Sequence, residues 1–289
     1  MNRLVLALAG ILAFPVYAAD FNVMSFNIRN SKDSVAGSDY DGQNTWQNRK
    51  EIVTSVFDQQ AVDIAGLQEA FSDQIMYLAR ALPEYSWVGV GRDDGNAKGE
   101  AVPIFYRNDK YVKLGGGTFW LSQSPQVVAS VGWDAELPRI TTWVRLENRH
   151  TGDRVLVFNA HFDHIGEQAR QKSAELLSET AKGIIGDDND AVIVLGDLNF
   201  ERTDKASYQA LTGLFSDARE VTEKPFSGVN GKKDHVFTYH GYFKEPTEDI
   251  DYIFVNDSLK VKEFRYVNTI RDGIYASDHL SVVAKLSYL

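Results

Sequence analysis

The sequence of 289 residues contains no cysteine, which excludes disulfide bonds, thiolate metal ligands and a lipid-modified cysteine. Positive charge is also scarce. The sequence has 30 lysine and arginine residues against 40 aspartate and glutamate residues, which gives a formal net charge of −10. No long basic run is present, which argues against an extended electrostatic surface for nucleic acid, although a bound cation can attract a phosphate locally. With 7 prolines, 22 glycines and 44% hydrophobic residues, the composition is that of a globular chain.

Only the N-terminus carries a long hydrophobic run. Arg3 is followed by the apolar stretch 4–16, and Val16 and Ala18 stand at the −3 and −1 positions before Ala19. These are the parts of a secretory signal peptide, and the stretch is shorter than the roughly 20 residues that a membrane-spanning helix needs. We therefore predict a signal peptide over residues 1–18, no transmembrane anchor, and an exported protein that is periplasmic or extracellular.

No repeat and no proline- or serine-rich linker divides the remaining chain, so residues 19–289 are expected to form a single domain. Apolar runs predict strands at 21–26, 62–67, 85–90, 101–106, 141–146, 155–158, 191–195, 250–255 and 280–286. Helical periodicity predicts helices at 43–57, 166–185 and 204–211, with Gly186 ending the second. Many strands with few helices between them indicate an α/β protein with stacked sheets and outer helices, rather than strict βαβ winding.

One apolar run ends abruptly in polar residues. The stretch 191–195 is almost purely aliphatic, as in a central strand that is buried on both faces, and Gly196-Asp197-Leu198-Asn199 follows it. Strand alternation places Asp197 and Asn199 on the same side, although glycine, aspartate and asparagine also favour a simple turn.

The same pattern recurs at other strand ends, which favours a shared site over a set of unrelated turns. The polar residues found there are Asn27, Gln68, Glu69, Asn159, His161, Asp163, His164, Asp251, Asp278 and His279. The oxygen donors of Asn27, Glu69 and Asp278 suit a hard cation, which favours Mg²⁺, with Mn²⁺ or Ca²⁺ as alternatives. A cation, imidazoles, an acid and an amide around one hollow are the parts for phosphoester hydrolysis.

With these segments in order along the chain, the sequence resembles the endonuclease/exonuclease/phosphatase superfamily, which has the deoxyribonuclease I-like fold. The matching segments are Ser25-Phe26-Asn27-Ile28, Leu67-Gln68-Glu69, Gly99-Glu100, Ile104-Phe105-Tyr106-Arg107, Asn159-Ala160-His161-Phe162-Asp163, Gly196-Asp197-Leu198-Asn199, Ile250-Asp251-Tyr252-Ile253 and Ser277-Asp278-His279. A further stretch resembles an exported bacterial branch of that superfamily, through Phe119-Trp120-Leu121-Ser122, Gly132-Trp133-Asp134 and Leu137-Pro138-Arg139.

The resemblance implies a four-layer α/β sandwich, in which two packed mixed β-sheets are flanked by helices and the site lies at one edge of the sheets. It implies that Glu69 holds the divalent ion, with Asn27 and Asp278 close to it. It does not decide whether Asp197 or His279 removes the proton of the attacking water.

The remaining roles that the resemblance implies concern pairing and substrate contact. His279 is expected to pair with Asp251 and His161 with Glu100, while Asp197 and Asn199 handle the water and the phosphate. His161, Asn199 and Arg107 are expected to contact the substrate phosphate, and His164 and Arg170 are weaker candidates.

The function expected from the sequence is therefore an exported, metal-dependent phosphoesterase that hydrolyses phosphodiester bonds. Nucleic acid, DNA or RNA, is the leading substrate class, and no stable protein partner is implied. The alternatives are an enzyme for small phosphoesters or phospholipid head groups, and a binding protein that has lost catalysis. A zinc hydrolase is a further alternative because His161-Phe162-Asp163-His164 resembles a metallo-β-lactamase run, but Asn159 stands where that run has another histidine.

Overall fold

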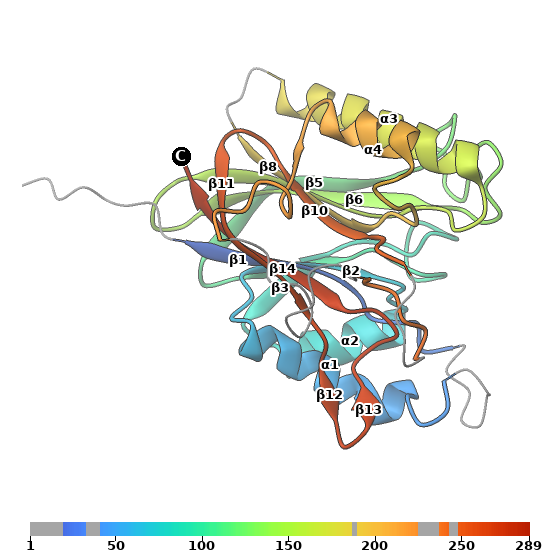
Figure 1. The fold of residues 1–289 in the computed structure, drawn as a ribbon, viewed down its shortest axis with the longest axis vertical. Helices are drawn as coiled ribbons and strands as arrows, with labels where there is room; N and C mark the ends of the chain where they lie inside the picture. The colour runs from blue at the N-terminus through green and yellow to red at the C-terminus, as the bar shows by residue number, and fades with distance from the viewer. Residues whose placement is uncertain (1–19, 33–40, 187–189, 225–236, 243–247) are drawn as a thin grey trace, which may run out of the picture.

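The computed structural model describes residues 20–32, 41–186, 190–224, 237–242 and 248–289. Two six-stranded sheets stack face to face, with α1 and α2 outside one sheet and α3 and α4 outside the other (Figure 1). The predicted four-layer α/β sandwich with two mixed sheets is thus confirmed. The predicted signal peptide lies outside the described residues, so export stays a prediction.

The first sheet has the strand order β11-β14-β1-β2-β4-β3. Its strands are β1 (Phe21–Asn27), β2 (Ile64–Gln68), β3 (Tyr85–Val88), β4 (Ile104–Arg107), β11 (Leu259–Val267) and β14 (Ser281–Tyr288). β1 and β2 run parallel, whereas the other neighbours in this sheet are antiparallel.

The second sheet has the order β5-β6-β7-β8-β10-β9, and a separate hairpin is formed by β12 and β13. Its strands are β5 (Tyr111–Trp120), β6 (Ile140–Asn148), β7 (Arg154–His161), β8 (Ala191–Asp197), β9 (Ser216–Asp217) and β10 (Asp251–Val255), and the hairpin is β12 (Ile270–Arg271) with β13 (Ile274–Tyr275). Here β7 and β8 are the parallel pair. Each predicted strand corresponds to a strand of the structure, but the long strands β5 and β11 and the two-residue strands β9, β12 and β13 were not predicted.

The helices are α1 (Trp46–Gln59), α2 (Ser72–Ala81), α3 (Glu167–Ile185) and α4 (Lys205–Thr212). The α3 helix buries Ala174, Leu177 and Ala181 in the apolar cluster on the second sheet. It ends at Gly186, as predicted, and the φ of 57° at that residue favours glycine. The α2 helix was not predicted. Among the described residues, no helix has the length and hydropathy needed to cross a membrane.

A polar link crosses the apolar core between the sheets. The Nδ2 of Asn159 on β7 donates to the carbonyl oxygens of Leu67 (2.8 Å) and Pro103 (3.0 Å), and its Oδ1 accepts from Gln68 Nε2 (2.6 Å). Gly66 makes room for this amide, because a Cβ there would lie 2.7 Å from Asn159 Cγ. Asn159 and Gln68 therefore hold the two sheets together in the interior.

The strand directions explain why the polar strand ends meet. β1, β2, β7 and β8 all finish at the same edge, since each parallel pair is in register and the two sheets are stacked. β10 and β14 run in the opposite direction and begin at that edge, where Asp251 pairs with Asp197. Side chains from distant parts of the sequence are thereby brought into one place.

Candidate active site

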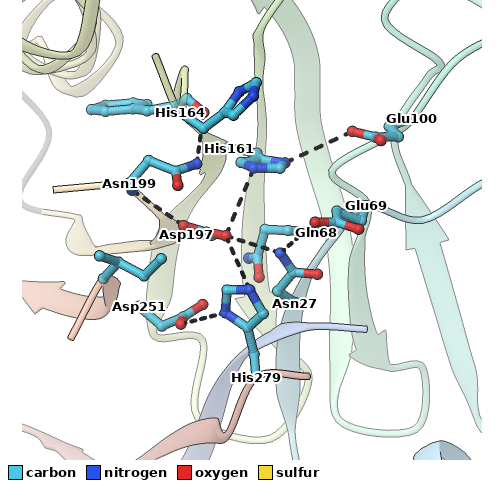
Figure 2. Close-up of polar contacts among 12 residues, drawn as sticks. Asn27, Gln68, Glu69, Glu100, His161, His164, Asp197, Asn199, Asp251 and His279 are labelled. Atoms are coloured by element: carbon cyan, nitrogen blue, oxygen red, sulfur yellow. Dashed lines mark hydrogen bonds and ion pairs between the residues drawn. The ribbon is translucent and has the colours of Figure 1, made fainter. Parts of the chain in front are cut away.

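A cavity of about 850 Å³ opens at this edge of the sandwich. Most of the residues predicted for the site line it, namely Glu69, Glu100, His161, His164, Arg170, Asp197, Asn199, Asp278 and His279. Asn27 and Asp251 lie directly behind this lining, bonded to Asp197 and His279 respectively (Figure 2).

Glu69 follows β2 and is held from two directions. Its Oε1 accepts from Asn27 Nδ2 (3.1 Å), and its Oε2 accepts from the backbone N (3.0 Å) and Nδ2 (3.2 Å) of Asn30. Burial alone raises the pKa of Glu69, but the charges of Arg29 and His279 and the bond from Asn27 outweigh it, so that the pKa lies below its ordinary value. Glu69 is therefore an ionised, oriented oxygen donor.

Asp278 and Glu69 share a cationic neighbour. Arg29 lies two residues after β1, with its Nη1 3.6 Å from Glu69 Oε2 and its Nε 3.8 Å from Asp278 Oδ2. The two carboxylates share this one guanidinium, and the amide of Asn27, whose Nδ2 donates to Glu69 and Asp197, lies beside them. The carboxylate oxygens of Glu69 and Asp278 are ligands that suit a hard divalent cation.

Asp197, the last residue of β8, is the centre of the polar network (Figure 2). Its Oδ2 accepts from Asn27 Nδ2 (2.9 Å) and lies 3.7 Å from His161 Nε2 and 3.8 Å from His279 Nε2. Burial, followed by repulsion from Asp251, raises the pKa of Asp197 to about 7. The carboxylate thus stands where two imidazoles, an amide and the cavity meet.

His279 is oriented by Asp251, as predicted. Its Nδ1 lies 2.8 Å from Asp251 Oδ2, and Asp251 is fully buried at the start of β10. Burial alone lowers the pKa of His279, but the charge and hydrogen bond of Asp251 and the charge of Asp197 outweigh it and raise the pKa to about 10. Tyr239 packs on this ring, with 4.9 Å between the ring centroids.

His161, the last residue of β7, has a different environment. Burial lowers its pKa well below the ordinary value, and the positive charges of Arg139 and Arg92 lower it further, so the ring is neutral. Its predicted partner Glu100 is nearby, but Oε2 lies 4.0 Å from His161 Nδ1 and only 2.7 Å from Arg92 Nη1. Glu100 is therefore bonded chiefly to Arg92, and the predicted pairing with His161 is not a hydrogen bond.

Asn199 reaches the cavity by leaving the strand. Its backbone N donates to Asp197 Oδ1 (3.1 Å), and its φ of 50° turns the chain, so strand alternation is not the reason that both residues face the cavity. Its Nδ2 donates to the carbonyl oxygen of Phe162 (3.0 Å).

The position of Arg107 differs from the prediction that it contacts the substrate phosphate, because Arg107 does not line the cavity. It ends β4, which runs antiparallel to β2, so it lies at the opposite end of the sheet from Glu69. Its Nε and Nη2 donate to both carboxylate oxygens of Asp109 (2.9 and 2.8 Å). The structure thus contradicts the predicted phosphate contact of Arg107.

Sequence reasoning missed the basic residues that do line the cavity. Arg29, Arg92 and Arg139 all face it, and Tyr239 joins them from a loop. Only Arg139 had a local signal, as the last residue of Leu137-Pro138-Arg139. Arg170, a weaker candidate from the sequence, also lines the cavity, and its Nη1 donates to the carbonyl oxygen of Asp163 (3.2 Å).

A second group could hold a cation. In the described part of the chain, ligand atoms of Asp197, Asp251 and His279 lie within 4.8 Å of one another. The Nδ1 of His279, however, is already bonded to Asp251, which leaves this group fewer free donors. The carboxylate oxygens of Glu69 and Asp278 therefore suit a hard cation better than this group does.

Arg49 on α1 fixes the segment that follows β1. The fully buried guanidinium donates to five backbone carbonyl oxygens, those of Ile28, Arg29, Asn30, Asn44 and Ala276. These bonds link the Asn27 side of the site to the segment that precedes Asp278. Arg49 is thus a positioning residue for the cavity.

We expect R49M to lower the free energy of unfolding, because each buried carbonyl left without a donor costs about 1–3 kcal/mol. R80M, at an exposed position of α2, is the matched control and is expected to change stability by less than about 0.5 kcal/mol. Urea denaturation measures both. Equal stability of the two variants would contradict this role for Arg49.

The comparisons with known proteins agree with this geometry. The model of the Endonuclease/Exonuclease/phosphatase family matches residues 24–279. A solved endonuclease/exonuclease/phosphatase from Bacteroides vulgatus is 35% identical, with a TM-score of 0.84, and the match covers 94% of this chain and 100% of that chain. The mannosyl-6-phosphatase of Bacteroides thetaiotaomicron is 36% identical, with a TM-score of 0.81, over 93% of this chain and 100% of that one.

A more distant likeness is to the Danio rerio TDP2 solved with a single-strand DNA product. It is 15% identical, with a TM-score of 0.69, and the match covers 93% of this chain and 99% of that chain, so it shows the fold alone. A search of curated proteins found no match.

Proposed function

This chain belongs to the endonuclease/exonuclease/phosphatase family, and from that premise we propose that it hydrolyses phosphate esters with the help of a bound divalent cation. The observation that carries the proposal is the convergence of Glu69, Asp197 and His279 on one cavity from three separate strand ends. A convergence of this kind is needed for a reaction that combines a cation, a nucleophilic water and a charged transition state.

Glu69, Asp278 and Asn27 are the residues that would hold the cation. Their oxygen donors favour Mg²⁺ or Mn²⁺ over Zn²⁺, which prefers nitrogen and sulfur ligands. When bound, such an ion withdraws charge from a phosphoryl oxygen.

The protein's own groups then orient the water and stabilise developing charge. We propose that Asp197 accepts the proton of the attacking water. Its Oδ2 accepts a hydrogen bond from Asn27 and lies 3.7 Å and 3.8 Å from the Nε2 atoms of His161 and His279. Asp251 fixes the ring of His279 so that Nε2 faces the cavity side. Groups preorganised in this way act on the transition state more than on the bound substrate.

A small phosphorylated molecule is the substrate that the cavity favours. The exposed carboxylates of Glu136, Glu201 and Glu248 line it, and the protein carries a net charge of −10. Both features repel a long polyanion, whereas carboxylates bind the hydroxyl groups of a sugar well. The mannosyl-6-phosphatase, at 36% identity, supports the same substrate class.

Nucleic acid, the leading class expected from the sequence, becomes the second candidate. The TDP2 solved with a DNA product shares only the fold with this chain, so it does not raise nucleic acid above the first candidate.

The test is phosphate or product release from a substrate panel of sugar phosphates, nucleotides, DNA, RNA, inositol phosphates and phospholipids. We expect sugar phosphates to be hydrolysed fastest, EDTA to abolish the activity, and Mg²⁺ or Mn²⁺ to restore it better than Zn²⁺. Fast hydrolysis of DNA or RNA would support the second candidate. Absence of hydrolysis of every phosphoester with every metal would refute the proposal.

A further inference from the structure

Arg139 is a charged residue in the cavity to which the proposed mechanism gives no task. It stands directly before β6, is 4% exposed, and lines the cavity together with His161 and Arg92. A buried arginine needs partners for its five N–H groups and for its charge.

Two of its nitrogen atoms are held by residues of the segment between β7 and α3. Its Nε donates to Asp163 Oδ1 (3.3 Å), and its Nη2 donates to His164 Nδ1 (2.8 Å). Asp163 is itself fixed, because its Oδ2 accepts from the backbone N of Ile165 (3.1 Å) and Gly166 (2.7 Å). The guanidinium therefore has a fixed position and plane.

The tautomer of His164 follows from this contact. A guanidinium only donates, so Nδ1 of His164 accepts and Nε2 carries the proton, which faces Glu136 Oε2 at 3.3 Å. Glu136, His164, Arg139 and Asp163 thus form one chain of polar contacts that runs from the rim of the cavity to its interior.

The third guanidinium nitrogen of Arg139, Nη1, is buried and lacks a hydrogen-bond partner among the residues that the structure describes. The positive charge of Arg139 is also felt at His161, in the middle of the site, where it helps to keep the ring neutral. A buried guanidinium N–H without a partner calls for an acceptor, and an anionic oxygen is the strongest one.

We propose that Arg139 binds a non-bridging oxygen of the substrate phosphate through Nη1 and selects for phosphomonoesters over phosphodiesters. This inference rests on the proposed function. A monoester carries three non-bridging oxygens and up to two negative charges, whereas a diester carries two such oxygens and one charge. The additional, charged oxygen of the monoester is the acceptor that Nη1 of Arg139 would take.

The test compares R139M and R139K with R107M, an arginine at the far end of the sheet. We expect R139M to raise the KM for a phosphomonoester and the inhibition constant of inorganic phosphate about 10–100-fold, the effect of one charge-assisted hydrogen bond. The KM for the diester bis-p-nitrophenyl phosphate is expected to change less than about threefold, and R107M to behave as wild type. R139K retains the charge without the planar fork and is expected to fall between R139M and wild type.

Each outcome has a distinct meaning. If R139M does not fold, R139K decides, since a fall in its preference for monoester over diester supports the proposal and an unchanged preference overturns it. Equal losses on both substrate types would show a merely structural role for Arg139. If wild type hydrolyses phosphoesters but R139M binds phosphate normally, this inference fails and the proposed function stands. If wild type hydrolyses none, the proposed function fails and this inference falls with it.

Discussion

Replacing Asp197 with asparagine is expected to lower kcat for phosphoester hydrolysis about 10²–10⁴-fold, the range for loss of a positioned acid or base. The reason is geometric, because Oδ2 of Asp197 accepts from Asn27 and faces the Nε2 atoms of His161 and His279. An asparagine cannot take a proton from water and carries no charge for the imidazoles to face. H161A and H279A are expected to cause losses in the same range.

The three residues are expected to act as a unit. The double variant D197N/H279A should therefore be only slightly slower than the slower of the two single variants, far from the product of their separate effects. D58N, on the exposed face of α1, is the matched control and is expected to retain wild-type turnover. Initial rates of phosphate release measure the series, and thermal unfolding verifies that each variant is folded. Near-normal turnover by D197N, or fully multiplicative effects, would remove Asp197 from the centre of the mechanism.

Replacing Glu69 with glutamine is expected to abolish cation binding and activity together. Glu69 supplies two oriented carboxylate oxygens, and it shares Arg29 with Asp278 as a cationic neighbour. We expect Mg²⁺ and Mn²⁺ affinity to fall by more than the roughly 10–100-fold that loss of an indirect partner costs. Isothermal titration calorimetry measures the change.

A neighbouring carboxylate serves as the control for this prediction. E201Q alters an exposed carboxylate on the rim of the same cavity and is expected to keep the wild-type cation affinity. If E69Q and E201Q bind Mn²⁺ equally well, the cation does not depend on Glu69.

The polar strand ends were predictable from the sequence because their signal is local. Asn27, Glu69 and Asp197 each follow a buried apolar run, and several such runs that end in polar residues indicate one shared edge. The register of the sheets then determines which ends meet, and register is a tertiary property. Arg107 was misplaced for this reason, because the antiparallel direction of β4 was not visible in its sequence.

The cavity arginines carry no local pattern. Arg29 and Arg92 lie in irregular segments, where an arginine that faces a site looks like a solvated one until the fold is known. The missed strands also have physical reasons. The strand signal of β5 is weakened by three consecutive glycines, Gly115, Gly116 and Gly117. In β11, a register shift between Val261 and Glu263 interrupts the alternation of apolar and polar residues.

The proposed function requires that a hard cation bind beside Glu69, within reach of Asp197. Anomalous diffraction from crystals grown with Mn²⁺ tests it most directly, with wild type and E69Q measured side by side. We expect one strong anomalous peak in contact with the Glu69 carboxylate in wild type, and we expect this peak to be lost in E69Q. A peak confined to the group of Asp197, Asp251 and His279, or a peak unchanged in E69Q, would contradict it.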